Sequence, residues 1–229
     1  MFTFENILIY SYLLPFIFFL FLKKEIRTRK EILVIVVYGI TFFVLINLQS
    51  FLTSRKLIWD HIKDFFFSFY TFTELLFFSL IYWINIKTRS FKILAIIISI
   101  LFVLFQVIYF FTVKNDQIDN IPVGLETLIM YIYIFCFFYS RFKNIDDQYI
   151  YNHYGFWISV GIMLYLGGSF FLFILGNHIS DEQIKSYWFL TYIIETVKNI
   201  LFSVAIVVYA KHRSKEKFPN QKLPFLDFN

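Results

Sequence analysis

Residues 187–210 read YWFLTYIIETVKNILFSVAIVVYA, an apolar run that contains one carboxylate, Glu195, and one side-chain amine, Lys198. A helix crosses a hydrocarbon core of about 30 Å with about 20 residues, so this run is long enough to span a membrane. Glu195 and Lys198 are three positions apart, which makes them neighbours on one face of a helix. The run therefore predicts a membrane helix whose charged face points into a bundle of other helices.

The whole chain has the composition of a membrane protein. Of its 229 residues, 59% are hydrophobic, 34 are Phe and only 16% are charged. A soluble domain carries about a quarter charged residues and could not cover so much apolar area with polar surface. We therefore expect an integral membrane protein that lies in a lipid bilayer.

Seven stretches have the length and hydropathy of a spanning helix, which predicts an all-α bundle of seven transmembrane helices in one domain, 1–210. The stretches lie near 4–22, 31–52, 65–84, 91–112, 122–139, 155–175 and 187–210. The first lacks the basic leader and the cleavage site of a signal peptide, so we expect it to be retained, with a kink at Pro15. Residues 211–229 are predicted to form a basic tail in the cytoplasm.

Lysines and arginines are distributed unevenly between the predicted connections. Most of the 21 lie near 23–30, 87–92 and 141–143 and in the tail, which alternate along the chain with poorly charged connections. Short cytoplasmic loops carry the excess of such residues, so we expect the N-terminus outside and the C-terminus in the cytoplasm. The net charge of +5 then reflects topology and attraction to anionic lipids at these loops and the tail, and does not indicate nucleic-acid binding.

The strongly polar groups inside the predicted helices lie at similar depths. At about 1.5 Å per residue, Glu74 lies roughly 13 Å and Glu195 roughly 12 Å below the outer ends of their helices, and Lys198 lies near the midplane. If the third and seventh helices are adjacent, the two carboxylates and the amine can share a proton or leave one net negative charge. Further candidates for a ligand- or proton-binding site, on the same helix faces or at nearby depths, are Tyr70, Gln106, Glu126, Tyr192 and Asn199.

Polar groups concentrate in the outer halves of the helices, whereas the inner halves, such as YIYIFCFFY at 131–139, offer only Tyr, Ser and one Cys. A transporter needs polar stations along its whole path, so this asymmetry favours an outward-opening pocket. Two simpler interpretations remain open. The Glu74, Glu195 and Lys198 cluster can act only as a contact between helices, and Glu126 can merely suit the positive end of a helix dipole.

Enzyme chemistry finds little support in the sequence. The four histidines fall in predicted loops or the tail, no Cys or His cluster has zinc spacing, and no serine-hydrolase motif is present, so we expect neither a catalytic site nor a metal site. A lysine in the last of seven helices is similar to the retinal-binding lysine of opsins. Microbial opsins place an Asp four residues before that lysine, whereas Glu195 lies three before Lys198, so retinal on Lys198 is an alternative and no cofactor is the expectation.

Three segments carry a resemblance to a wider group of proteins: FYTFTELLFFSLIYW at 69–83, GFWISVGIMLYLGGSFFLFIL at 155–175 and ETVKNILFSVA at 195–205. In these segments the chain resembles small seven-helix bacterial membrane proteins and the seven-helix sensor regions of bacterial histidine kinases. The resemblance implies a sensory or signalling module in the bacterial cytoplasmic membrane that acts through a membrane or cytoplasmic partner. The alternatives are a transporter or channel subunit and a structural subunit of a membrane complex.

Overall fold

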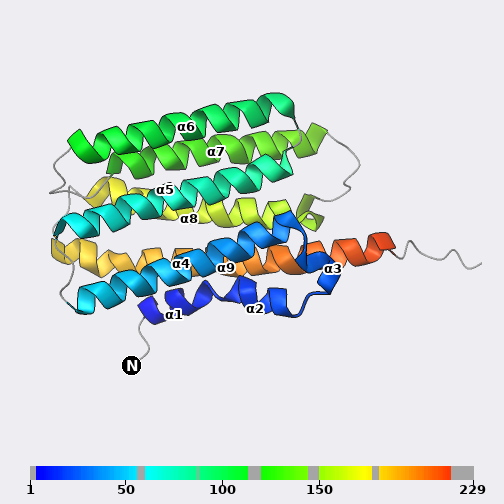
Figure 1. The fold of residues 1–229 in the computed structure, drawn as a ribbon, viewed down its shortest axis with the longest axis horizontal. Helices are drawn as coiled ribbons and strands as arrows, with labels where there is room; N and C mark the ends of the chain where they lie inside the picture. The colour runs from blue at the N-terminus through cyan, green and yellow to red at the C-terminus, as the bar shows by residue number, and fades with distance from the viewer. Residues whose placement is uncertain are drawn as a thin grey trace, which may run out of the picture.

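The computed structural model describes residues 4–55, 60–86, 88–112, 120–143, 150–176 and 181–217, and these residues fold into helices that run side by side (Figure 1). The helices are α1 (Phe4–Ser11), α2 (Leu14–Leu20), α3 (Lys24–Arg27), α4 (Lys30–Ser54), α5 (Asp60–Asn85), α6 (Arg89–Thr112), α7 (Asn120–Lys143), the short 3-10 helix η1 (Ile150–Asn152), α8 (Tyr154–Gly176) and α9 (Asp181–Lys217). The described part of the chain contains no strand.

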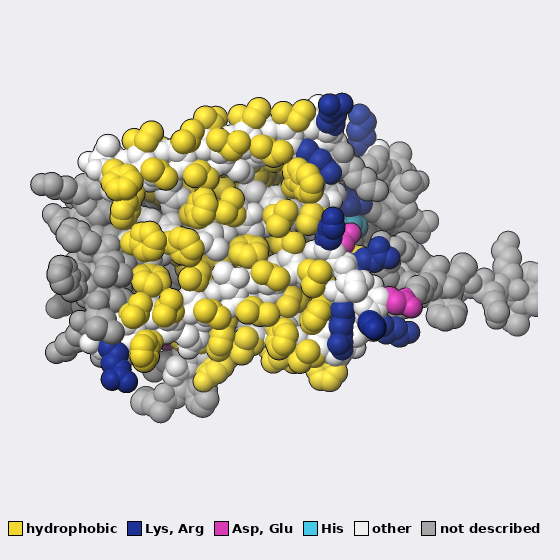
Figure 2. All heavy atoms as spheres, in the orientation of Figure 1, with side chains coloured by type: hydrophobic (Ala, Val, Ile, Leu, Met, Phe, Trp, Pro, Cys, Tyr) yellow, Lys and Arg dark blue, Asp and Glu magenta, His cyan; other side chains and the backbone are white. Residues whose placement is uncertain are grey.

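Six of these helices, α4 to α9 without η1, are long and apolar enough to cross a membrane. Their outward faces carry large apolar side chains, for example Ile108 and Phe135, which are 62% and 70% exposed. Figure 2 shows such side chains along the length of the bundle, with lysines and arginines gathered at the end where α3 lies. A surface of this kind suits lipid and not water, as an integral membrane protein requires.

The first predicted helix, 4–22, is broken into α1 and α2 at Tyr12 and Leu13. Pro15 explains the position of the break, because it has no N–H to donate to the carbonyl of Ser11 and its ring crowds that carbonyl. The two pieces together, Phe4–Leu20, are shorter than the six spanning helices. A seventh membrane crossing therefore stays a prediction.

The six long apolar segments of the structure agree with the predicted spans to within four residues at each end. Two helices continue beyond their spans: α9 runs from Asp181 to Lys217, so the predicted tail begins as helix, and α5 begins at Asp60. Hydropathy detects only the part of a helix that lies in lipid. The backbone can continue as a helix into water where Lys, Glu and Gln follow, since these residues have high helix propensity.

The helices close into a ring. Going round it, α4 packs on α5, α5 on α7, α7 on α8, α8 on α9, and α9 on α1 and α2, which return to α4. Helix α6 lies outside the ring against α5 and α7, and it is the least buried of the six spans. In Figure 1, α6 lies at one edge of the bundle and α1 with α2 at the other. The interior of the ring is thus where residues from the start and the end of the chain meet.

The break between α1 and α2 packs against a glycine of α4, Gly39. A Cβ atom at Gly39 would collide with the carbonyl oxygen of Tyr12, which is backbone and cannot move aside like a side chain. The absence of a side chain at Gly39 therefore lets the broken helix approach α4 closely and fixes the position of Tyr12.

We predict that Gly39→Ala lowers the unfolding free energy by about 1–3 kcal/mol, the usual cost of overpacking. Gly124→Ala is the matched control, because a Cβ there meets only the Phe170 ring at 3.9 Å. That substitution should be neutral or stabilise by up to about 1 kcal/mol through helix propensity. Denaturation in mixed detergent micelles measures both, and equal stability of the two variants would contradict the packing of Tyr12 on Gly39.

Candidate functional site

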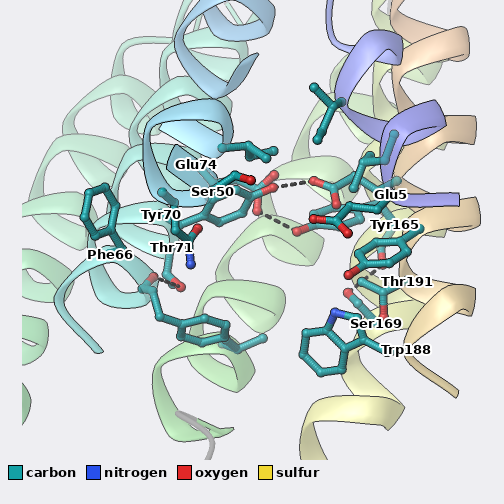
Figure 3. A pocket seen from close by; sticks show the side chains of 18 of the residues that line it. Glu5, Ser50, Phe66, Tyr70, Thr71, Glu74, Tyr165, Ser169, Trp188 and Thr191 are labelled. Atoms are coloured by element: carbon teal, nitrogen blue, oxygen red, sulfur yellow. Dashed lines mark hydrogen bonds between the residues drawn. The ribbon is translucent and has the colours of Figure 1, made fainter. Parts of the chain in front are cut away.

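A cavity of about 520 Å³ lies inside the ring, between α1, α4, α5, α7, α8 and α9. It reaches the end of the bundle opposite the basic one, where the exposed side chains of Glu5, Ser50 and Thr53 line it. Deeper in, it is lined by Glu74, Glu126 and Glu195. In Figure 3, Phe66, Tyr70 and Thr71 lie on one side and Glu5, Ser169, Trp188 and Thr191 on the other.

Lys198 lies beneath this cavity and is completely buried. Its Nζ atom is 2.9 Å from Oε1 of Glu74 and 3.4 Å from Oε1 of Glu195, and it donates a hydrogen bond of 2.6 Å to the hydroxyl of Tyr38. The ammonium also lies 3.7 Å from the centroid of the Tyr165 ring, in a cation–π contact. One cation is thus shared between two carboxylates and an aromatic face.

Tyrosine hydroxyls complete the coordination of both carboxylates. Tyr12 and Tyr70 each donate a short hydrogen bond to Oε1 of Glu195. In the same way, Tyr38 donates to Oε1 of Glu74 at 2.9 Å, and Tyr165 donates to its Oε2 at 2.8 Å. Both oxygens of Glu74 therefore accept hydrogen bonds. The cluster formed by Glu74, Glu195 and Lys198 holds two carboxyl groups and one amine, which leave one net negative charge or one shared proton.

The other predicted site residues divide into two groups. Tyr70, Glu126 and Tyr192 line the cavity. Asn199 and Gln106 do not: the amide of Asn199 donates to Oγ of Ser11 at 2.8 Å, and that of Gln106 donates to the Ser68 carbonyl at 2.6 Å. These two residues connect α9 with α1 and α6 with α5. Their amide groups therefore bond to neighbouring helices, and their part in a ligand- or proton-binding site stays a prediction.

Glu126 does not fit the interpretation that it only complements a helix dipole. Helix α7 begins at Asn120, so Glu126 lies in the second turn, beyond the first turn in which the dipole is felt most. Its side chain is only 2% exposed, and its Oε1 has no hydrogen-bond partner among the residues that the structure describes. A carboxylate placed in this way belongs to the cavity and not to the helix end.

Sequence reasoning missed three tyrosines that contact the cluster, Tyr12, Tyr38 and Tyr165. All three lie well inside the predicted spans, away from the span ends where the aromatic belt of a membrane protein explains tyrosines. A tyrosine in the middle of a span has a hydroxyl that needs a partner. This signal is present in the sequence, in VVYGI at 36–40 and IMLYL at 162–166.

The side chains that the structure describes allow ion and hydrogen-bond chemistry but form no metal centre. Across the described ranges, no three His, Cys, Asp or Glu side chains are grouped so as to hold a metal ion. Retinal on Lys198 gains no support either, because the rings of Tyr12, Tyr38, Phe78 and Tyr165 lie around Nζ, which is already engaged in two ion pairs. What the site offers is a carboxylate-lined cavity above a charge cluster.

Comparison of the sequence with protein-family models, with curated proteins and with solved structures finds no match. The resemblance to seven-helix sensor regions therefore stays a prediction, and the function must be argued from the site.

We predict that Lys198→Met lowers the unfolding free energy by about 3–5 kcal/mol, because it leaves two buried carboxylates without their cation. Lys211→Met is the matched control, an exposed lysine on the same helix, and should change stability by no more than about 0.5 kcal/mol. Replacing both carboxylates as well, with Glu74→Gln and Glu195→Gln, should restore part of the loss. Denaturation of the four proteins measures these differences, and a Lys198→Met variant as stable as the wild type would contradict the cluster.

Proposed function

We propose that this chain is a sensory or signalling module of the bacterial cytoplasmic membrane, with seven spanning helices, its N-terminus outside and its C-terminus in the cytoplasm. In this proposal the cavity receives a stimulus from the outer side, and α9 passes it to a partner at the cytoplasmic side. The observation that carries the proposal is the direct connection between the cavity and α9. The floor of the cavity is a charge cluster, and two of its three charged residues, Glu195 and Lys198, lie on α9.

A conformational signal needs an element with two arrangements of similar free energy, which a ligand then biases. The cluster suits this role because Glu195 is bound by tyrosines from two other elements, Tyr12 at the α1–α2 break and Tyr70 on α5. A change of charge at the cavity floor alters these hydrogen bonds together. Because Lys198 pairs with Glu74 on α5 as well as with Glu195 on its own helix, a change in these ion pairs alters the contact between α9 and α5, and α9 can then shift relative to its neighbours.

The transport alternative is less well supported. On the basic side of Lys198, the buried rings of Phe78 and Phe202 pack 6.2 Å apart and both contact Tyr38. Some polar side chains there bond to one another or to the backbone, as when Tyr82 donates to Ser159 at 3.1 Å and Ser203 to the Asn199 carbonyl at 2.9 Å, whereas Oδ1 of Asn85 has no described partner. Every buried charged side chain that the structure describes belongs to the cavity or its floor: Glu74, Glu126, Glu195 and Lys198.

The output is assigned to the basic end of the bundle. Helix α9 continues to Lys217, and lysines and arginines gather at the same end in Figure 2. These charges attract anionic lipids of the inner leaflet and offer a surface to an acidic partner. No enzymatic activity is part of the proposal.

The orientation can be tested with single cysteines, because Cys136 is the only native one. In a Cys136→Ser background, we expect a membrane-impermeant maleimide to label Thr53→Cys in intact spheroplasts. Lys24→Cys, an exposed residue at the basic end, should be labelled only after permeabilisation. The opposite labelling pattern would show that the orientation is reversed and that the cavity does not open to the outside.

The signalling role predicts that a charge change at the cavity floor moves the basic end of α9. Nitroxide labels at Arg89→Cys on α6 and Lys211→Cys on α9, both exposed, report the distance by double electron–electron resonance. We expect Glu195→Gln to shift the distance by about 1–2 Å or to populate a second distance, as helix shifts do in switching proteins. Glu31→Gln, outside the cavity, is the control. Identical distributions in wild type and Glu195→Gln would show that the cluster is a static contact and would end the proposal.

A further inference from the structure

We propose that the cavity binds an amphipathic organic cation, an amine or quaternary ammonium compound with an apolar body, and that Glu126 is its counter-ion. This inference rests on the proposed function in taking the cavity as the place where the stimulus binds. It goes further because it names the chemical class of the ligand and the residue that recognises its charge.

Glu126 indicates a ligand because one oxygen of its buried carboxyl group is left unpaired by the described residues. Its carboxyl group is buried at the wall of the cavity, and Oε1 accepts no hydrogen bond from any described residue. Buried carboxylates are normally paired or hydrogen-bonded, because an unpaired charge is costly away from water. The nearby cation cannot serve, since Lys198 is already held by Glu74 and Glu195. A positively charged ligand supplies the partner that Oε1 of Glu126 lacks.

The lining of the cavity is rich in acidic groups. Four carboxylates line it, Glu5, Glu74, Glu126 and Glu195, whereas no lysine or arginine is among its described lining residues. Lys198 beneath the floor offsets one of the four, so acidic groups remain in excess, which disfavours anions and concentrates cations. This charge pattern favours a positively charged ligand before any specific contact forms.

The size and the wall of the cavity suit an organic ligand. A volume of about 520 Å³ is far larger than a bare metal ion and falls in the range of small-molecule sites, about 300–1,000 Å³. Six aromatic side chains line it: Phe66, Phe67, Tyr70, Tyr165, Trp188 and Tyr192. Aromatic faces attract ammonium groups and pack against apolar carbon. The buried hydroxyl of Thr191, which has no described partner, can bind a second polar atom of the ligand.

The test uses three probes with the same aromatic skeleton and different charge: 2-phenylethylamine, the neutral 2-phenylethanol and the anionic 3-phenylpropanoate. The purified full-length protein is titrated with each at pH 7, and its melting temperature is recorded. We expect a saturable rise with the amine, and at least tenfold weaker apparent affinity for the alcohol and the acid. Glu126→Gln should weaken amine binding at least tenfold, whereas Glu31→Gln, the same change outside the cavity, should leave it unaltered.

Three results would overturn the inference: no shift with the amine, equal shifts with all three probes, or full amine affinity in the Glu126→Gln protein. The comparison of probes on the wild type needs no variant, so the test stands even if Glu126→Gln fails to fold. The distance measurement on α9 requires no ligand. If it succeeds and the amine does not bind, the ligand class is wrong and the sensor survives; if the amine binds and α9 does not move, the cavity binds cations without signalling.

Discussion

The burial of one ammonium group, that of Lys198, governs the interior of this protein. A charge at the centre of a bilayer costs several kcal/mol unless it is paired, so the chain must bring carboxylates to it. Glu195 comes from the same helix and Glu74 from α5, and each brings tyrosine hydroxyls that occupy its oxygens. Those tyrosines in turn come from the α1–α2 break, α4, α5 and α8. Five segments of the ring thus meet at one cation, and the cavity is the space that remains above this meeting point.

Part of this arrangement could be predicted from the sequence and part could not. Hydropathy predicts six of the helices well, because a lipid core leaves little choice of structure. The spacing of Glu195 and Lys198 indicates a pair, and the depth of Glu74 indicates its approach to them. Hydropathy does not, however, determine which helices are neighbours. The position of α6 outside the ring, which takes Gln106 away from the cluster, therefore required the structure.

The break at Tyr12 shows why the missing members of the site were hard to see. Pro15 indicates a distortion, but the direction in which the freed Tyr12 side chain points depends on the close contact of its backbone with Gly39. Such a contact depends on how two helices pack together, so the sequence of one helix alone does not reveal it. Glu126 is a similar case, since its meaning depends on the cavity that α7 shares with five other elements. The local sequence predicts the chemistry of these residues but not which other residues they contact.

Closure of the ring by its first and last helices also has a consequence for biosynthesis. Glu74 and Lys198 are separated by 124 residues, which a ribosome needs about 6–25 s to add at 5–20 residues per second. Throughout that interval Glu74 has been synthesised and its ammonium partner has not. An isolated carboxyl group enters lipid far more cheaply as the neutral acid than as the anion. Insertion of α9 is then the step that supplies the ammonium partner, and until that step Glu74 lies in the membrane as an unpaired acid.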